Sequence, residues 1–129
     1  MTRFRSWLRA QELTVCADVH VKHGAHAIVA DRSVVGLTRD AVFFDAGVIV
    51  ATGQRTGDSA NRDEILTIKE GTHPPTVVGG GVNEDNVEDI LSMREGVIIA
   101  SSLERDGVWW NEANPERVRR FMKRARTVA

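Results

Sequence analysis

Cysteine is scarce in this sequence. Cys16 is the single cysteine among 129 residues, so no disulfide bond can form within the chain. It lies in the apolar run 13–17, and this setting predicts a buried structural thiol. A chain without disulfide bonds suits a reducing compartment, so we expect a cytoplasmic location.

Long apolar runs are missing as well. Hydrophobic residues make up 42% of the chain, but no stretch reaches the roughly 20 apolar residues that a membrane-spanning helix needs. The basic segment 1–9 lacks the apolar core and the cleavage site of a signal peptide. Nothing has the composition of a low-complexity tract or a flexible linker. Residues 1–129 are therefore expected to form one compact domain, or a part of one.

Neither sign of charge is in excess. The 17 basic and 18 acidic residues leave a net charge of -1, which gives no electrostatic reason to expect bulk binding to nucleic acid or to anionic membranes. Peripheral contact with a membrane through a local patch stays open. The basic residues of segment 117–126 could contact an acidic partner. A solvated helix face that complements the helix dipole is the favoured interpretation of this segment.

Short β-branched runs alternate with helical patterns along the chain. This alternation predicts an α/β domain with a parallel sheet. Strands are expected at 13–21, 48–51, 76–78 and 96–100. Helices are expected at about 3–10, at 31–44 after a cap at Asp31 or Ser33, at 61–69 and 83–93, and from Asn114 onward. Four strands, each followed by a helix, fit an open doubly wound sheet or part of a closed barrel, and the pattern does not decide between these two folds.

Small residues follow the third and fourth predicted strands. The third ends in Gly79, Gly80 and Gly81, with a helix expected directly afterwards, and the fourth is followed by Ser101 and Ser102. Glycines let the backbone approach an anion, and a helix N-terminus adds a favourable potential. Two such loops after the last two strands of a run are typical of a barrel phosphate site. These five residues are the predicted phosphate-binding residues.

Polar residues gather at the end of the first predicted strand. Asp18, Lys22 and His23 are the catalytic candidates, since a cation can polarise a carbonyl and a carboxylate can act as a base. A structural ion pair between Asp18 and Lys22 is the alternative. His20 and His23 could ligate a metal ion, but the sequence offers no clear third ligand, so no metal is predicted.

The loop after the second predicted strand is polar and rich in turn residues. We expect it to line the mouth of the site through Thr52, Gly53, Thr56 and Gly57. Its spacing differs from that of the P-loop motif, so it gives no direct support for nucleoside triphosphate binding.

An aromatic pair, Trp109-Trp110, lies in the loop after the fourth predicted strand. Exposed, it could form a partner surface or a lid over the mouth of the site. Packing against the neighbouring helix is an equally weighted alternative.

These motifs occur in an order that resembles the BtpA family, which includes the SgcQ-like proteins. The resemblance covers almost the whole chain and is carried by segments 17–23, 52–57, 78–86, 96–103, 106–107 and 114–122. It implies a (β/α)8 TIM barrel of about twice this length, of which this chain would hold strands five to eight. The first half would then be absent, through truncation or a split gene, or two copies would associate to complete the barrel.

Several positions depart from the family pattern. Gly80 replaces the usual serine, Ala100 the usual glycine and Glu104 the usual lysine, while segment 94–96 reads Arg-Glu-Gly instead of Ala-Asp-Gly. Glu104 would place a carboxylate near the predicted phosphate.

The resemblance implies three functional hypotheses. In the first, the chain binds a phosphorylated small molecule or nucleotide and acts on it, as a candidate nucleoside triphosphatase would. In the second, it is a non-catalytic factor for the biogenesis or stability of a membrane protein complex of the photosystem I type. In the third, it is an inactive truncated remnant. The sequence identifies no cofactor and leaves open whether the chain is an enzyme.

Overall fold

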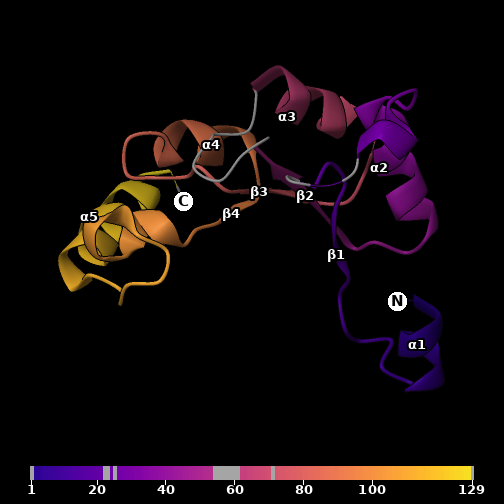
Figure 1. Cartoon of the computed structure of the whole chain (residues 1–129), viewed down its shortest axis with the longest axis horizontal. Coiled ribbons are helices and arrows are strands. Elements are labelled where there is room, and N and C mark those ends of the chain that lie inside the picture. Colours follow the sequence, from indigo (N-terminus) through magenta and orange to yellow (C-terminus); the bar gives the residue numbers. More distant parts are fainter. Residues whose placement is uncertain (1, 22–23, 25, 54–61, 71, 129) are drawn as a thin grey trace.

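Four parallel strands form one sheet and lie side by side in their order along the chain (Figure 1). The strands are β1 (Cys16–Asp18), β2 (Val48–Thr52), β3 (Thr76–Gly79) and β4 (Gly96–Ile98). The computed structural model describes residues 2–21, 24, 26–53, 62–70 and 72–128. Parallel neighbours need a crossover between them, and this arrangement confirms the predicted α/β class.

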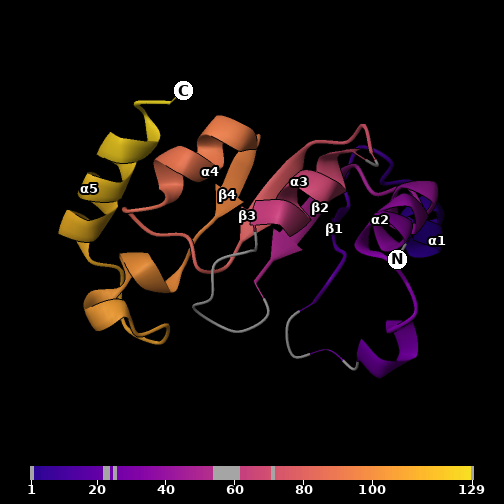
Figure 2. The ribbon, with the colours of Figure 1, turned by 90° about the horizontal axis from the view of Figure 1, so that it is seen from above.

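Helices cover one face of this sheet (Figures 1 and 2). The crossovers contain α2 (Val34–Phe43), α3 (Arg62–Glu70) and α4 (Val87–Met93). The chain begins with α1 (Thr2–Trp7) and closes with α5 (Pro115–Ala125), which packs beside α4. Three short 3₁₀ segments complete the described part, namely η1 (His26–Val29), η2 (Ser101–Leu103) and η3 (Arg105–Gly107). Within the described residues, no helix is both long and apolar enough to cross a bilayer.

The main core lies between the sheet and these helices. Residues paired directly across parallel strands project from the same face, so Ile49 and Ala51 share a face with Val78. These three pack against apolar side chains of the helices and of the loop after β3, which are Ile65, Ile68, Val82, Val87, Ile90 and Phe121.

The opposite face of the sheet is apolar and partly open. Val50 pairs with Val77, and Gly79 pairs with Ile98, so all four belong to this open face. Ile98 is 52% exposed although it lies within a strand. Cys16 falls on the same face and is exposed, so the expectation of a buried thiol is wrong. Parallel sheets are normally covered on both faces, and the helices among the described residues cover one of them.

Several element boundaries differ from those expected, and three of the differences lie near the strand ends. The first strand has only three residues because the Asp18 carboxylate accepts a hydrogen bond from the backbone N–H of His20 and turns the chain. The fourth strand ends at Ile98. The helix expected from Asn83 begins at Val87, because the Asn83 side chain accepts from two backbone N–H groups and forms a turn instead.

Two residues before β4 fix this segment to neighbouring elements. The carboxylate of Glu95 accepts a hydrogen bond of 2.9 Å from the backbone N–H of Thr76, and this bond lowers the pKa of Glu95. Arg94 is only 5% exposed and donates to the backbone carbonyls of Ile65 and Met93. Burial lowers the pKa of its guanidinium. The Glu95 contact lies at the amino-terminal edge of the sheet, opposite the strand ends described below.

Candidate functional site

The carboxyl ends of the four strands meet at one edge of the sheet. Asp18, Thr52, Gly79 and Ile98 are the last residues of β1 to β4, and the register pairs Thr52 with Gly79 and Gly79 with Ile98. The loops that follow these residues therefore lie next to one another. In parallel α/β domains this edge is where ligands bind.

The loop after β3 depends on glycine for its path. Gly80 and Gly81 have φ angles of 79° and 66°, a region that L-residues adopt only with strain. The Asn86 side-chain amide donates to the Gly81 carbonyl at 2.9 Å and fixes the loop to the next turn. Gly79 has another role, because an added Cβ would lie 3.2 Å from the Thr52 side chain. Gly79 allows close packing in the sheet, while Gly80 and Gly81 shape the loop.

The two serines after β4 are not equivalent. The Ser102 hydroxyl donates to the Val82 carbonyl at 2.6 Å and so joins the loop after β4 to the loop after β3. Its single proton is therefore committed within the protein. The Ser101 hydroxyl makes no hydrogen bond within the described residues, and its carbonyl accepts from the Glu104 N–H. Ser101 is therefore the serine whose hydroxyl can donate to a ligand.

Arg117 on α5 adds a cation that the sequence interpretation had assigned to a solvated helix face. Its guanidinium donates to the Ser102 carbonyl at 3.2 Å. Other arginines of α5 are held by carboxylates, as in the pairs Arg120–Glu84 and Arg124–Glu88. Within the described residues, Arg117 has no carboxylate partner. Helical spacing could have indicated that Arg117 faces the protein, because it lies one turn before Phe121, which is buried.

These groups surround a cavity of about 470 Å³. Four predicted phosphate-binding residues line it, namely Gly80, Gly81, Ser101 and Ser102. Arg117 and Trp109 also line it. The sequence interpretation had assigned Arg117 to a solvated helix face, and for Trp109 it had left open a partner surface, a lid over the mouth, or packing against the neighbouring helix. Such a volume lies within the range of small-molecule sites.

Glu104 is not among the residues that line this cavity. Its Oε2 atom is buried and has no hydrogen-bond partner in the structure. The backbone of Glu104 pairs with Ala113 in an antiparallel bridge. The sequence suggested that the Glu104 carboxylate would lie near a bound phosphate and repel it. Because Glu104 does not line the cavity, it would not contact a phosphate bound there.

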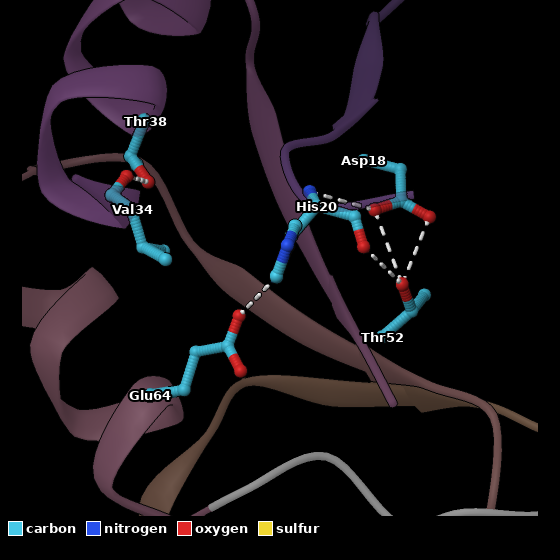
Figure 3. Close-up of polar contacts among 6 residues, drawn as sticks. All are labelled: Asp18, His20, Val34, Thr38, Thr52 and Glu64. Atoms are coloured by element: carbon cyan, nitrogen blue, oxygen red, sulfur yellow. Dashed lines mark hydrogen bonds and ion pairs between the residues drawn. The ribbon is translucent and has the colours of Figure 1, made fainter. Parts of the chain in front are cut away.

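A second polar cluster lies at the ends of β1 and β2 (Figure 3). The Thr52 hydroxyl lies 3.2 Å from both carboxylate oxygens of Asp18, and the His20 backbone N–H donates to the same carboxylate. Thr52 and Gly53, which were predicted to line the mouth, are both buried and do not line the cavity described above, so this role stays a prediction. Asp18 belongs to the open face, because it pairs with Val50.

Four predicted site residues cannot be placed in this cluster. Lys22 and His23, the catalytic candidates beside Asp18, lie outside the described residues. Thr56 and Gly57 of the mouth loop do so as well. Their predicted roles stay predictions.

His20 belongs to this cluster through a carboxylate that the sequence did not single out. Its Nδ1 lies 2.9 Å from Oε1 of Glu64 on α3, and both side chains are mostly buried (Figure 3). No local pattern could have found Glu64, because it lies 44 positions further along the chain. The described residues contain no group of three or more His, Cys, Asp or Glu that could hold a metal ion. His20 and Glu64 thus form a polar pair that fixes the loop after β1 against α3.

A family model matches residues 1–127, and its family is the BtpA family. The chain belongs to the BtpA family. This confirms the resemblance seen in the order of the sequence motifs.

Relatives occur in a eukaryote, an archaeon and a cyanobacterium. An uncharacterized mitochondrial protein of Caenorhabditis elegans is 30% identical over 128 residues, which are 99% of this chain and 46% of that protein. An uncharacterized protein of Thermococcus kodakarensis is 32% identical over 91% of this chain and 44% of its own length. The photosystem I biogenesis protein BtpA of Synechocystis is 30% identical over 95% of this chain and 42% of its own length. The chain thus spans less than half the length of these BtpA-family relatives.

A solved structure shares the fold. Phosphoribosyl anthranilate isomerase from Thermus thermophilus, a TIM barrel, matches all of this chain and 57% of its own chain with a TM-score of 0.65. The sequence identity is 16%, so the likeness concerns the fold alone. It agrees with four parallel strands and outer helices in this BtpA-family chain.

Proposed function

We propose that this chain binds a phosphorylated small molecule in the cavity between the loops after β3 and β4. The observation that carries the proposal is Arg117, a half-buried guanidinium that lines the cavity without a carboxylate partner among the described residues. Gly80 and Gly81 border the same cavity with bare backbone, and Ser101 adds a hydroxyl that can donate.

The chemistry of these groups suits a phosphate. Removing a charged group from water costs free energy unless an opposite charge compensates it, and a phosphate dianion would compensate Arg117. The planar guanidinium can donate two parallel hydrogen bonds to phosphate oxygens. Glycines without side chains allow the anion to approach the main chain, and Ser101 can donate a third kind of hydrogen bond.

The proposal extends to the architecture around the site. We infer that the four strands are the second half of a (β/α)8 barrel, whose interior is the open face of the sheet. The exposed Ile98, the apolar pair Val50 and Val77, and the length of the relatives support this inference. The remaining strands would come from further residues of the same polypeptide or from another chain, and they would cover both bare edges.

Any reaction on the bound phosphate ester would use the polar cluster at β1 and β2. Asp18, with Lys22 and His23, supplies the catalytic candidates of this proposal. Asp18 lies on the open face, which would be the barrel interior, and strand ends in such barrels carry the reacting groups. Loss of turnover with unchanged binding in Asp18→Asn would support this role.

Titration calorimetry with inorganic phosphate and glycerol 3-phosphate tests the binding step. We expect Arg117→Gln to weaken both, by about tenfold or more, because a hydrogen bond to a charged group contributes about 1.5–3 kcal/mol. Arg119→Gln is the matched control, since Arg119 lies on the same helix and pairs with Glu116 on the surface. Equal affinities in the two variants, or no binding by the folded wild-type chain, would contradict the proposal.

A second candidate function follows from one relative. The Synechocystis protein is named for photosystem I biogenesis, and the aromatic ring of Trp110 is 70% exposed and does not line the cavity. Under this alternative, Trp110 contacts a membrane protein complex. Co-sedimentation with purified photosystem I that is lost in Trp110→Ser, together with no response to any phosphate, would favour it over ligand binding.

A further inference from the structure

The loop that follows η2 is built like a hairpin whose base is closed by the backbone. The Asn114 N–H donates to the Leu103 carbonyl at 2.8 Å, and the Arg105 N–H donates to the Glu112 carbonyl at 3.0 Å. Ion pairing between Arg105 and Glu112, at 3.1 Å, closes the same base. The path also needs Asp106 and Gly107 at φ angles of 58° and 71°. These contacts, all within residues 103–114, define the path of the segment.

Trp109 lies at the tip of this hairpin and lines the cavity. A turn from Val108 to Asn111 presents it, with a hydrogen bond of 2.9 Å between the Asn111 N–H and the Val108 carbonyl. Its side chain is 67% exposed. The neighbouring Trp110 packs edge to face against it, at 5.3 Å between ring centroids, but does not line the cavity. One tryptophan therefore borders the site while the other supports it from outside.

Part of the cavity lining is apolar. Ile98, Ile99 and Val82 line the cavity together with the tryptophan, and its polar side chains come from Asn83, Ser101, Ser102 and Arg117. A cavity of about 470 Å³ is far larger than a bare phosphate ion requires. The same cavity thus combines a place for an anion with an apolar space that ends in an exposed aromatic ring.

We propose that Trp109 forms a ring subsite, so that the ligand is a phosphate monoester carrying a flat aromatic or heteroaromatic group. This inference rests on the proposed phosphate binding and adds the chemical class of the ester. An indole that is held in place loses little conformational entropy on stacking, and stacking against another ring adds to the burial of its area. A nucleotide and a simple aryl phosphate share this chemistry.

Calorimetry with three probes tests the subsite. Glycerol 3-phosphate supplies a phosphate without a ring, phenyl phosphate adds a simple ring, and adenosine monophosphate adds a nucleobase. We expect the wild-type chain to bind at least one of the two ring-bearing probes about fivefold or more tightly than glycerol 3-phosphate. Preference for phenyl phosphate alone would identify an aryl ester, and preference for the nucleotide alone would identify a nucleobase.

Variants at the hairpin tip separate the subsite from the anion site. Trp109→Leu should remove the preference for ring-bearing probes and leave the affinity for glycerol 3-phosphate within about twofold. Trp109→Phe should keep a part of the preference, and Trp110→Leu, the matched control, should keep most of it, because Trp110 contacts Trp109 but does not line the cavity. Each variant is compared with the wild type by thermal unfolding, which should change little because both rings are largely exposed.

The outcomes distinguish a failure of the ring subsite from a failure of the phosphate binding on which it rests. Equal affinity for all three probes, or a ring preference that survives in Trp109→Leu, overturns the ring subsite and leaves phosphate binding intact. Failure of all three probes to bind the folded wild-type chain overturns phosphate binding, and the ring subsite with it.

Discussion

Ser101 and Ser102 offer a sharp test because adjacent hydroxyls have opposite roles in the structure. Ser102 donates to the Val82 carbonyl at 2.6 Å, and the Val82 residue is buried. Ser102→Ala removes this bond and leaves the carbonyl without that donor. A buried polar group without a partner costs about 1–3 kcal/mol. Because the cavity lets water approach, we expect the lower half of this range, about 1–2 kcal/mol.

The magnitude translates into a measurable thermal shift. For a domain of this size, about 1–2 kcal/mol corresponds to a decrease in Tm of roughly 3–8 °C. Ser101→Ala removes a hydroxyl that has no hydrogen-bond partner among the described residues, so its unfolding free energy should change by no more than about 0.5 kcal/mol. Thermal unfolding followed by circular dichroism measures both variants under the same conditions.

The affinity for a phosphate ligand should fall more in Ser101→Ala than in Ser102→Ala, which is the reverse of the order expected for stability. Ser101→Ala removes the donor that faces the proposed phosphate, and we expect about tenfold weaker binding of glycerol 3-phosphate. Ser102→Ala should retain most of the affinity at temperatures where it is folded. Identical Tm values for the two variants, or a larger affinity loss in Ser102→Ala, would refute the assignment of one serine to the loops and the other to the ligand.

Three further predictions concern the loops and the sheet. Gly81→Ala forces an L-residue to a φ of 66° and should lower the unfolding free energy by about 1–2 kcal/mol in denaturant titration; an unchanged midpoint would show that the loop does not need glycine. The lowered pKa of Glu95 contributes stability that is present above its ordinary value of 4.5 and is lost as the pH falls below it. Glu95→Gln should therefore unfold with a weaker dependence on acid pH, and an unaltered pH profile would exclude this contribution. Ile98→Asp should abolish any self-association of the chain through the open face. Its stability should fall only a little, because Ile98 is 52% exposed. If sedimentation velocity still shows the same assembly, the contact between copies lies elsewhere.

Much of the architecture could be predicted from local sequence patterns. The alternation of β-branched runs with helical periodicity predicted four parallel strands, and each expected strand has a counterpart in the sheet. Small residues after the third and fourth strands predicted two loops that do lie around one cavity. Local patterns succeed here because backbone propensity, capping and burial periodicity are properties of neighbouring residues.

The ends of the elements were less predictable. The strand expected to continue to residue 21 stops at Asp18, and the helix expected from Asn83 starts at Val87. In both places a side chain accepts a hydrogen bond from the backbone N–H two residues further along the chain. Such local side-chain bonds compete with regular structure, and sequence periodicity does not show which of them forms.

The sequence by itself determined the class of the fold, the glycine loop and the pair of serines as a candidate anion site. Only the tertiary structure decided which serine can donate to a ligand, that Arg117 faces the cavity, and that Cys16 is exposed on the open face. It also brought Glu64 to His20. The physical reason is that these outcomes depend on the register of distant strands and on how helices pack across them. Residues far apart in the chain set that geometry, and no local pattern contains it.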